Sequence, residues 1–286
     1  MRFVKYQALG NDYLVLDGMH AVDPDRNLIR AICDRHYGVG SDGVLILSAI
    51  SDDAYTIRII NPDGSEAEKS GNGLRIFARY LWDEGFTSKK TFDVITLSDK
   101  VTCRLEDDGT VTVDMGRASF DSKDVPVNSE KMQTIREVIE VGGQILEYTA
   151  VSTGNPHCVI ISENLSEERT RRIGKLIENH PIFPNRTNVQ FVEVLDKNNI
   201  RIDIWERGAG YTYSSGSSSS AAACVVHKLG MCERDIDVHM AGGIIKVTIS
   251  DDFHITISGD VRRIAEGSFS ADFIDQNIRP VCNFSR

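Results

Sequence analysis

A long internal repeat constrains the fold of this chain more than any other feature. When the sequence is shifted by 144 or 145 positions, features of the first half meet similar features of the second half in the same order. The matched pairs are Gly10-Asn11 with Gly154-Asn155, 28–36 with 173–180, 56–60 with 201–205, Ser70-Gly71 with Ser215-Gly216, Gly85 with Gly230, Asp93-Val94 with Asp237-Val238 and Asp107-Asp108 with Asp251-Asp252. This agreement in one register indicates two diverged copies of one folding unit.

Each half combines strands with one apolar helix. Apolar and polar residues alternate at 56–60, 110–113 and 254–257, which predicts strands. A nearly all-apolar helix follows each Ser-Gly pair, over about 73–83 and 219–229, and helices of this kind are usually buried. The pattern predicts an α+β fold, in which each half is a curved, mostly antiparallel sheet around a central helix. We expect the halves at 1–120 and 121–286, and the last strand is free to cross back to the first half.

Composition excludes several functional classes. The 286 residues carry a formal net charge of −10 and no Lys/Arg cluster, so a nucleic-acid partner is not expected. The longest apolar runs, such as 14–16 and 44–47, are far too short to cross a membrane. The N-terminus has no signal-peptide pattern, which predicts a cytoplasmic protein with a small-molecule ligand. A homodimer is the default assembly.

The cysteines give no sign of a metal or redox site. The chain has six, and none forms a CxxC pair. Most have apolar neighbours, which is typical of small core residues. The six positions are Cys33, Cys103, Cys158, Cys224, Cys232 and Cys282.

The starts of the two central helices are candidate anion sites. A helix N-terminus has unpaired backbone N–H groups and a positive partial charge. Gly71, Gly73 and Gly216 would let a ligand approach this backbone closely. Across a pseudo-twofold axis, two such starts would face one carboxylate from both sides, in a cleft of the kind that commonly binds ligands. The structural alternative is that Ser70 and Ser215 are ordinary N-caps.

Mirror-related groups on two faces of one carbon suit inversion of a stereocentre. One group removes a proton from the carbon while the other delivers a proton to the opposite face. The helix dipoles would stabilise the carboxylate and the negative charge that develops when the α-proton leaves. This pattern favours racemisation or epimerisation by two bases.

The chain contains five distinctive motifs, which are Gly10-Asn11-Asp12, Asn61-x-Asp63-Gly64-Ser65-Glu66, Ser70-Gly71-Asn72-Gly73-x-Arg75, Gly154-Asn155-Pro156-His157 and Glu206-Arg207-Gly208-Ala209-Gly210. In order and spacing, these motifs resemble those of the diaminopimelate epimerases. The resemblance covers the chain from Met1 to the region near Gly259. It implies two pseudo-symmetric halves and an isomerase that inverts one α-carbon of an amino acid without pyridoxal phosphate or metal. The implied substrate is diaminopimelate, a precursor of lysine and peptidoglycan.

The resemblance also implies a set of substrate-binding residues. The far amino-acid end of the substrate would be held by Asn61, Asn188 and Arg207, and an Arg suits a bidentate grip on a carboxylate. In isolation each Asn is equally typical of a turn or a cap. The side-chain contacts fall on Asn11, Asn61, Asn155, Asn188, Glu206 and Arg207, and the backbone contacts to the reacting carboxylate fall on Gly71, Asn72, Gly216 and Ser217.

The chain departs from the family at the two catalytic bases. Those bases are cysteines in the family, whereas this chain has Ser70 and Ser215. A thiol titrates near 8.5 and a helix N-terminus lowers that value, whereas a serine hydroxyl normally needs an adjacent base. Three explanations stay open: a natural variant with modified chemistry, a catalytically silent relative that binds or regulates, and a deliberate double substitution that traps a ligand. A related proton abstraction, such as elimination of water from a hydroxy amino acid, is also compatible.

The surroundings of the two serines differ from the family pattern as well. Tyr211 stands where the family usually has an acidic residue, Lys69 precedes Ser70, and serines occupy 217–220. If the serines are active, a neighbouring group must activate them, although each such group has a structural or solvated alternative. The candidates are Asp63, Glu66, Glu68, His157, Glu206, Tyr211 and Tyr213.

Three other functional classes compete with an isomerase. The sequence Gly-Val-Gly-Ser-Asp-Gly at 38–43 misses the spacing of a dinucleotide loop and precedes a strand-like run. Ser217 lacks the flanking glycines of a hydrolase nucleophile elbow. A non-catalytic amino-acid-binding protein would keep the carboxylate contacts and need no base. Exchange of the substrate α-proton separates that protein from an enzyme.

Overall fold

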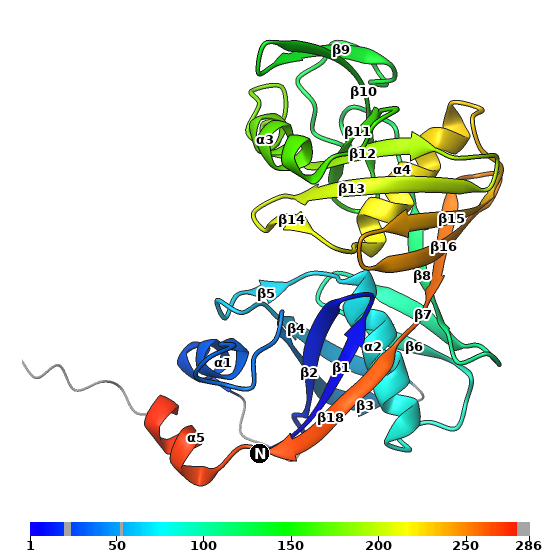
Figure 1. Ribbon diagram of the computed structural model, residues 1–286. Coiled ribbons are helices and arrows are strands. Elements are labelled where there is room, and N and C mark those ends of the chain that lie inside the picture. Colours follow the sequence, from blue (N-terminus) through cyan, green and yellow to red (C-terminus); the bar gives the residue numbers. More distant parts are fainter. Residues whose placement is uncertain (20–23, 52–53, 279–286) are drawn as a thin grey trace, which may run out of the picture. The chain divides into compact units, whose positions relative to one another are not determined.

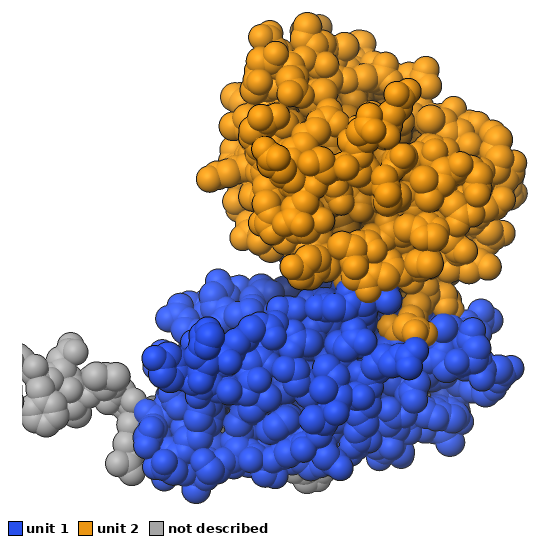
Figure 2. All heavy atoms as spheres, viewed as in Figure 1, with its two compact units in different colours: residues 1–111, 261–286 blue, residues 112–260 orange. Residues whose placement is uncertain are grey.

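The computed structural model describes residues 1–19, 24–51 and 54–278, which form two compact units (Figure 2). Unit 1 is Met1–Val111 with the segment that begins at Val261, and unit 2 is Thr112–Asp260. The division therefore falls at 111/112 instead of the expected 120/121. The reason is that Ser119 pairs with Ser152, which ties the chain beyond residue 111 to unit 2.

Unit 1 is a mixed sheet packed on one central helix (Figure 1). Its strands follow the order β18-β1-β2-β3-β4-β6-β7, and β5 pairs with β4. The pairs β2–β3 and β4–β6 are parallel, and the other pairs are antiparallel. Its elements are β1 (Arg2–Ala8), β2 (Asn11–Asp17), α1 (Arg26–Cys33), β3 (Val44–Ser51), β4 (Ala54–Ile60), β5 (Glu66–Ala67), α2 (Gly71–Asp83), β6 (Thr91–Ile95), β7 (Lys100–Leu105), β18 (Arg262–Ser268) and α5 (Ala271–Ile278).

Unit 2 repeats the central part of this plan, from β1–β7 to β10–β16, and has the further strands β17 and β8 at one side. The order is β9-β10-β11-β12-β13-β15-β16-β17-β8, and β14 pairs with β13. Here β11–β12 and β13–β15 are parallel, as β2–β3 and β4–β6 are in unit 1. The predicted repeat and the α+β class are confirmed. The elements are β8 (Val111–Arg117), β9 (Glu137–Val141), β10 (Gln144–Ser152), β11 (Pro156–Ile161), α3 (Glu167–Glu178), β12 (Asn188–Val194), β13 (Asn199–Glu206), β14 (Gly210–Thr212), α4 (Gly216–Lys228), β15 (Asp235–Met240), β16 (Gly243–Ile249) and β17 (His254–Gly259).

The two central helices are buried, as the sequence predicts. Helix α2 contacts β1, β2 and β7, and α4 contacts β10–β13 and β15–β17. The alanines at 221–223 are fully buried, and their small side chains let α4 lie close to its sheet. Both helices have 13 residues and begin directly after Ser70 and Ser215. The expected starts at about 73 and 219 are too late, because the serine caps stabilise a first turn made of weak helix formers.

Three observations concern membrane spans, metal ligands and cysteines. The part of the chain described here contains no helix long and apolar enough to span a membrane. Among the same residues, no group of His, Cys, Asp and Glu side chains is arranged to hold a metal ion. The cysteines at 33, 103, 158, 224 and 232 are buried and unpaired, and Cys282 lies outside the described residues.

Candidate active site

Two serines cap the two central helices in the same way. Ser70 Oγ accepts a hydrogen bond from the backbone N–H of Gly73 at 3.0 Å. Ser215 Oγ accepts one from the N–H of Ser218 at 3.4 Å. Both serines have extended backbones, with φ of −144° and −153°. Each serine is therefore an N-cap, and each also stands at the positive end of a buried helix, where an anion would be stabilised.

In unit 1 the structure brings Asn11 and Asn72 together beside Ser70. Nδ2 of Asn72 donates to Oδ1 of Asn11 at 3.2 Å. Nδ2 of Asn11 donates in turn to Asp42 at 2.9 Å, and Asp42 is paired with Arg35. Because both amides are held by other side chains, their orientation is fixed before any ligand binds.

Arg75 anchors this group from inside unit 1. Its side chain is fully buried, and burial lowers the pKa of Arg75 to about 10. Its guanidinium donates to Oδ1 of Asn72 at 2.6 Å and to the carbonyl of Gly71 at 3.3 Å. Its Nε has no partner, and no carboxylate pairs with it in the described parts of the chain. From the sequence, Arg75 is named only as part of a motif and is given no role. A charged Arg within an otherwise apolar, buried helix could have indicated a functional or structural role for this residue.

Asn61 lies in a turn at the end of β4. Its Nδ2 donates to Oγ of Ser65 at 3.0 Å, and its carbonyl accepts from the N–H of Gly64 at 2.9 Å. The neighbouring carboxylates have other partners: Asp63 accepts from Ser65 at 2.6 Å, and Glu66 pairs with Arg58 at 3.2 Å. Asp63 and Glu66 are therefore engaged by Ser65 and Arg58, and Glu68 is exposed.

In unit 2 Asn188 joins two segments of the candidate site. The side chain of Asn188 is 5% exposed and donates to the carbonyl of Pro156 at 2.9 Å. Its Oδ1 accepts from the backbone N–H of Arg207 at 2.9 Å. The Arg207 guanidinium donates to the carbonyl of Asn185 at 3.1 Å, and the residue is exposed. Asn188 thus fixes the backbone of the predicted carboxylate-binding arginine.

Glu206 lies on the same face of the sheet as the start of α4. Strand side chains alternate between faces. Trp205 and Asp203 face α3, because Trp205 donates to Glu178 at 2.7 Å and Thr170 donates to Asp203 at 3.5 Å. Glu206 therefore points to the opposite face, toward Ser215. Burial raises the pKa of the Glu206 carboxyl, and the influence of the Ser215 hydroxyl partly offsets that rise.

His157 is buried between Asn155 and the core of unit 2. Its Nε2 lies 2.8 Å from Oδ1 of Asn155, and burial lowers the pKa of His157 to about 3. Its Nε2 also lies 3.2 Å from the hydroxyl of Thr153, whereas its Nδ1 has no partner. Gln190 is a separate support of the helix start, because it donates to Oγ of Ser218 in the first turn of α4 at 3.0 Å. A neutral His157 therefore supports the orientation of Asn155.

The two tyrosines that the sequence suggested as activators lie elsewhere. The hydroxyl of Tyr211 donates to Asp203 at 3.4 Å, and the Arg171 guanidinium lies 4.7 Å from the centre of its ring. Tyr211 pairs with Trp205 across the strands and so shares the α3 face, opposite to Ser215. Tyr213 is 59% exposed. The sequence could not show this, because a strand residue reaches one face or the other according to register.

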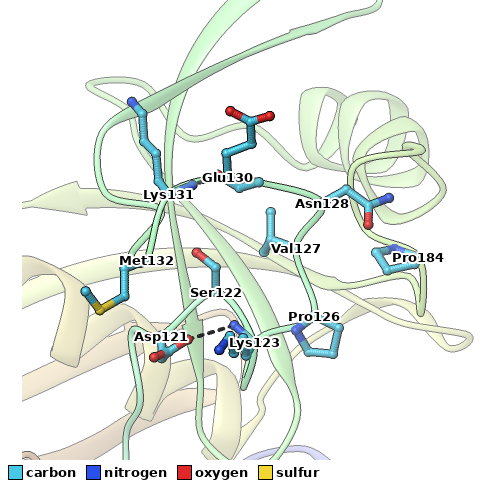
Figure 3. A pocket seen from close by; sticks show the side chains of 11 residues that line it. Asp121, Ser122, Lys123, Pro126, Val127, Asn128, Glu130, Lys131, Met132 and Pro184 are labelled. Carbon is cyan, nitrogen blue, oxygen red and sulfur yellow. Dashed lines mark hydrogen bonds between the residues drawn. The ribbon is translucent and has the colours of Figure 1, made fainter.

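Four of the described cysteines are poorly suited to act as thiolates. Burial raises the pKa of Cys33, Cys158, Cys224 and Cys232. A hollow of about 380 Å³ in unit 2, shown in Figure 3, contains none of the sequence-predicted site residues. Its lining includes Asp121, Ser122, Lys123, Asn128, Lys131 and Met132.

Comparison with known proteins decides the family. The family model described as diaminopimelate epimerase matches residues 3–121 and 149–264. The chain belongs to the diaminopimelate epimerase family. Within this family, it is 50% identical over 277 residues to diaminopimelate epimerase 2 of Nostoc, covering 95% of this chain and 96% of that one. It is 38% identical to diaminopimelate epimerase of Caldanaerobacter subterraneus, covering 93% of this chain and 98% of the relative.

Solved structures show that diaminopimelate epimerases share this fold with other proteins. A hydroxyproline epimerase from Agrobacterium vitis superposes with a TM-score of 0.70 at 15% identity, over 93% of this chain and 91% of that one. A phenazine biosynthesis protein of the PhzF family from Bacillus anthracis has a TM-score of 0.67 at 15% identity, over 93% and 98% of the two chains. The helix-around-sheet architecture of both halves is therefore that of a known fold.

Proposed function

We propose that this protein inverts the α-carbon of diaminopimelate by moving protons, without a cofactor. The observation that carries the proposal is the equivalence of Ser70 and Ser215. Each caps the buried helix of one copy of the same unit, and Ser70 is followed by Asn72, whose amide is held by Asn11 and Arg75. The names of the relatives, diaminopimelate epimerases at up to 50% identity, support the choice of substrate.

The two half-sites divide the work on one substrate. The backbone at Gly71 and Asn72, and that at Gly216 and Ser217, holds the reacting carboxylate. The serine on one side accepts the α-proton as the Cα–H bond breaks, and the electron pair moves into the carboxylate. The serine on the other side donates its hydroxyl proton to the opposite face of the carbon. The positive end of each helix stabilises negative charge on the substrate atoms bound beside it.

A second group of residues binds the end of the substrate that lies away from the reacting carbon. Asn61, Asn188 and Arg207 hold the second amino-acid group, for which the exposed guanidinium of Arg207 offers a bidentate grip. Asn11 and Asn155 complete the contacts near the reacting centre. The fixed amides of Asn11 and Asn72 support tight positioning, because little side-chain freedom is lost on binding.

Glu206 is the group that supports proton transfer at Ser215. Its carboxylate faces the Ser215 hydroxyl, and burial raises its pKa, which makes it a stronger base once ionised. As Ser215 takes the α-proton, it passes its own hydroxyl proton to Glu206. The reverse transfer returns the proton. Serine thereby acts with a carboxylate instead of ionising by itself.

A second candidate function is binding without turnover. The observation that favours it is the presence of serine at both positions that carry a catalytic cysteine in the family, with each serine already used as an N-cap. Such a protein would hold the amino acid in the same half-sites. A dehydratase that acts on a hydroxy amino acid would use the same first step and then expel a hydroxide.

One experiment separates these functions. The protein is incubated in heavy water with LL-diaminopimelate and with a panel of free amino acids, and loss of the α-proton signal is followed by NMR. Exchange with diaminopimelate supports the epimerase, and a new vinylic or keto signal identifies a dehydratase. No exchange with any substrate, but strong exchange after Ser70→Cys and Ser215→Cys, shows a scaffold that binds without turnover.

Two further expectations from the sequence are part of the proposal. A cytoplasmic location agrees with the biosynthetic substrate. A homodimer is the expected assembly, and light scattering coupled to size-exclusion chromatography measures its mass directly.

A further inference from the structure

A tyrosine that the family motifs do not single out lies beside Ser70. Tyr13 is on β2, two residues after Asn11, and only 7% of its surface is exposed. Its phenolic oxygen lies 3.4 Å from Oγ of Ser70. This is long for a hydrogen bond between hydroxyls, and such catalytic contacts commonly shorten when a substrate binds.

The internal repeat places Tyr13 at the position that His157 has in unit 2. Tyr13 follows Asn11 by two residues, as His157 follows Asn155. The next residues, Leu14 and Cys158, pair with the adjacent parallel strand in each unit, through Val44 and Val189. One titratable side chain therefore occupies this position in each half, a phenol in unit 1 and an imidazole in unit 2.

The packing of unit 1 makes room for the ring of Tyr13. A Cβ atom added at Gly43 would lie 2.7 Å from Cε1 of Tyr13, which no real Cβ contact allows. The glycine lets the ring lie flat against the backbone before β3. On the other side, a Cβ atom at Gly73 would lie 3.2 Å from Oγ of Ser70. Two glycines thus define the space in which the phenol and the serine hydroxyl meet.

We propose that Tyr13 is the proton-holding partner of Ser70, as Glu206 is the partner of Ser215. The inference rests on the proposed function and names the group that lets serine act there. In one direction the Cα–H bond breaks, Ser70 Oγ takes that proton, and its own hydroxyl proton passes to the Tyr13 phenolate. In the other direction the phenol returns a proton to Ser70, which delivers its proton to the carbanion. No proton or electron is gained or lost overall.

The chemistry favours a phenol for this role over serine alone. A phenol titrates at about 10, far closer to the working pH than an aliphatic hydroxyl, which needs an adjacent base to be activated. A cysteine at position 70 would need no such partner, because a thiol at a helix start ionises near neutral pH. The role of Tyr13 is therefore tied to the presence of serine at position 70.

The first test uses Tyr13→Phe, which removes one oxygen atom and keeps the ring. We expect α-proton exchange of diaminopimelate to fall about 100-fold and its rise toward alkaline pH to disappear. In a Ser70→Cys background the same substitution should change the rate less than threefold. Tyr55→Phe is the matched control, because Tyr55 is a buried tyrosine of unit 1 that donates to the carbonyl of Phe86 at 3.0 Å. An unchanged rate and pH profile in Tyr13→Phe overturns the proposal.

A second measurement does not depend on turnover. In protein labelled with ¹³C at the tyrosine ζ carbons, the Tyr13 signal is identified by its loss in Tyr13→Phe and is titrated with pH. If the two hydroxyls are coupled, Ser70→Ala shifts the midpoint for Tyr13 and leaves that for Tyr55 in place. If the titration midpoint of Tyr13 is unchanged in Ser70→Ala, the proposed pairing of Tyr13 with Ser70 is wrong, whatever the activity. If the midpoint shifts but the protein shows no α-proton exchange, the pairing stands and the epimerase function is rejected.

Discussion

Nη2 of Arg75 lies 2.6 Å from Oδ1 of Asn72, so a fully buried cation sets the orientation of an amide at the start of α2. Burying a charge without a carboxylate partner is unfavourable, and the hydrogen bond to Asn72 offsets only part of the lost hydration free energy. The main effect of the contact is therefore to orient the Asn72 amide beside the proposed carboxylate site.

Arg75→Met should therefore weaken substrate binding more than folding. Removing the buried charge offsets the loss of its hydrogen bonds, so we expect the free energy of unfolding to change by less than about 2 kcal/mol. The freed Asn72 should cost about tenfold in affinity, roughly 1.4 kcal/mol. Calorimetry with diaminopimelate and urea unfolding measure the two quantities. A large loss of stability with unchanged affinity contradicts this view of Arg75.

The two cap serines should differ from an ordinary cap in activity and not in stability. Ser70→Ala and Ser215→Ala should each lose about 1 kcal/mol of stability and all detectable α-proton exchange. Ser166 is the matched control, because it caps α3 by accepting from the N–H of Arg169 at 3.4 Å. Ser166→Ala should lose similar stability and keep the exchange rate. Equal activity losses in all three variants would reduce Ser70 and Ser215 to structural caps.

His157 should make the protein less stable in mild acid. Its pKa falls from the usual 6.5 to about 3 in the folded state, so its contribution is fully present above 6.5 and is lost as pH falls from there toward 3. Between pH 7.5 and pH 5 this loss is about 2 kcal/mol. Urea unfolding at both values should show the loss in the wild type and not in His157→Gln. The exposed His36 provides the comparison, and His36→Gln should keep the full dependence.

Gly43→Ala should disturb the site through Tyr13. The added methyl group would lie 2.7 Å from the ring and 2.7 Å from the carbonyl of Ile60, and such overpacking typically costs about 1–3 kcal/mol. We expect a lower melting temperature and slower α-proton exchange. In Gly43→Ala with Tyr13→Phe, the melting temperature should stay low and the exchange rate should match that of Tyr13→Phe alone. An additive loss of exchange would mean that Gly43 affects the reaction by another route.

The sequence predicted the repeat, the fold class and the family because these depend on patterns within each segment. Alternation identifies strands, and the Ser-Gly pairs mark the helix starts, so Ser70 and Ser215 could be placed in advance as matched positions. The strand order then follows from the repeat, since each unit pairs its strands in the same way.

Contacts between distant segments were harder to predict. Tyr13 was missed, although the repeat aligns it with His157, because no local pattern shows that β2 passes beside the start of α2. Tyr211 is a candidate activator from the sequence, whereas its strand register puts it on the face opposite to Ser215. Arg75 was missed as an anchor because its partner Asn72 was considered only for its backbone.

The pairing of β18 with β1 completes unit 1 with a strand that follows unit 2 in the sequence. During synthesis, β1 leaves the ribosome before unit 2, and Arg262–Ser268 leaves it after unit 2. The edge of β1 that pairs with β18 therefore has no β18 partner while unit 2 is being synthesised. Unit 2 contains its own strands from Thr112 to Asp260 and can fold during that interval, so the order of folding is the reverse of the order of synthesis.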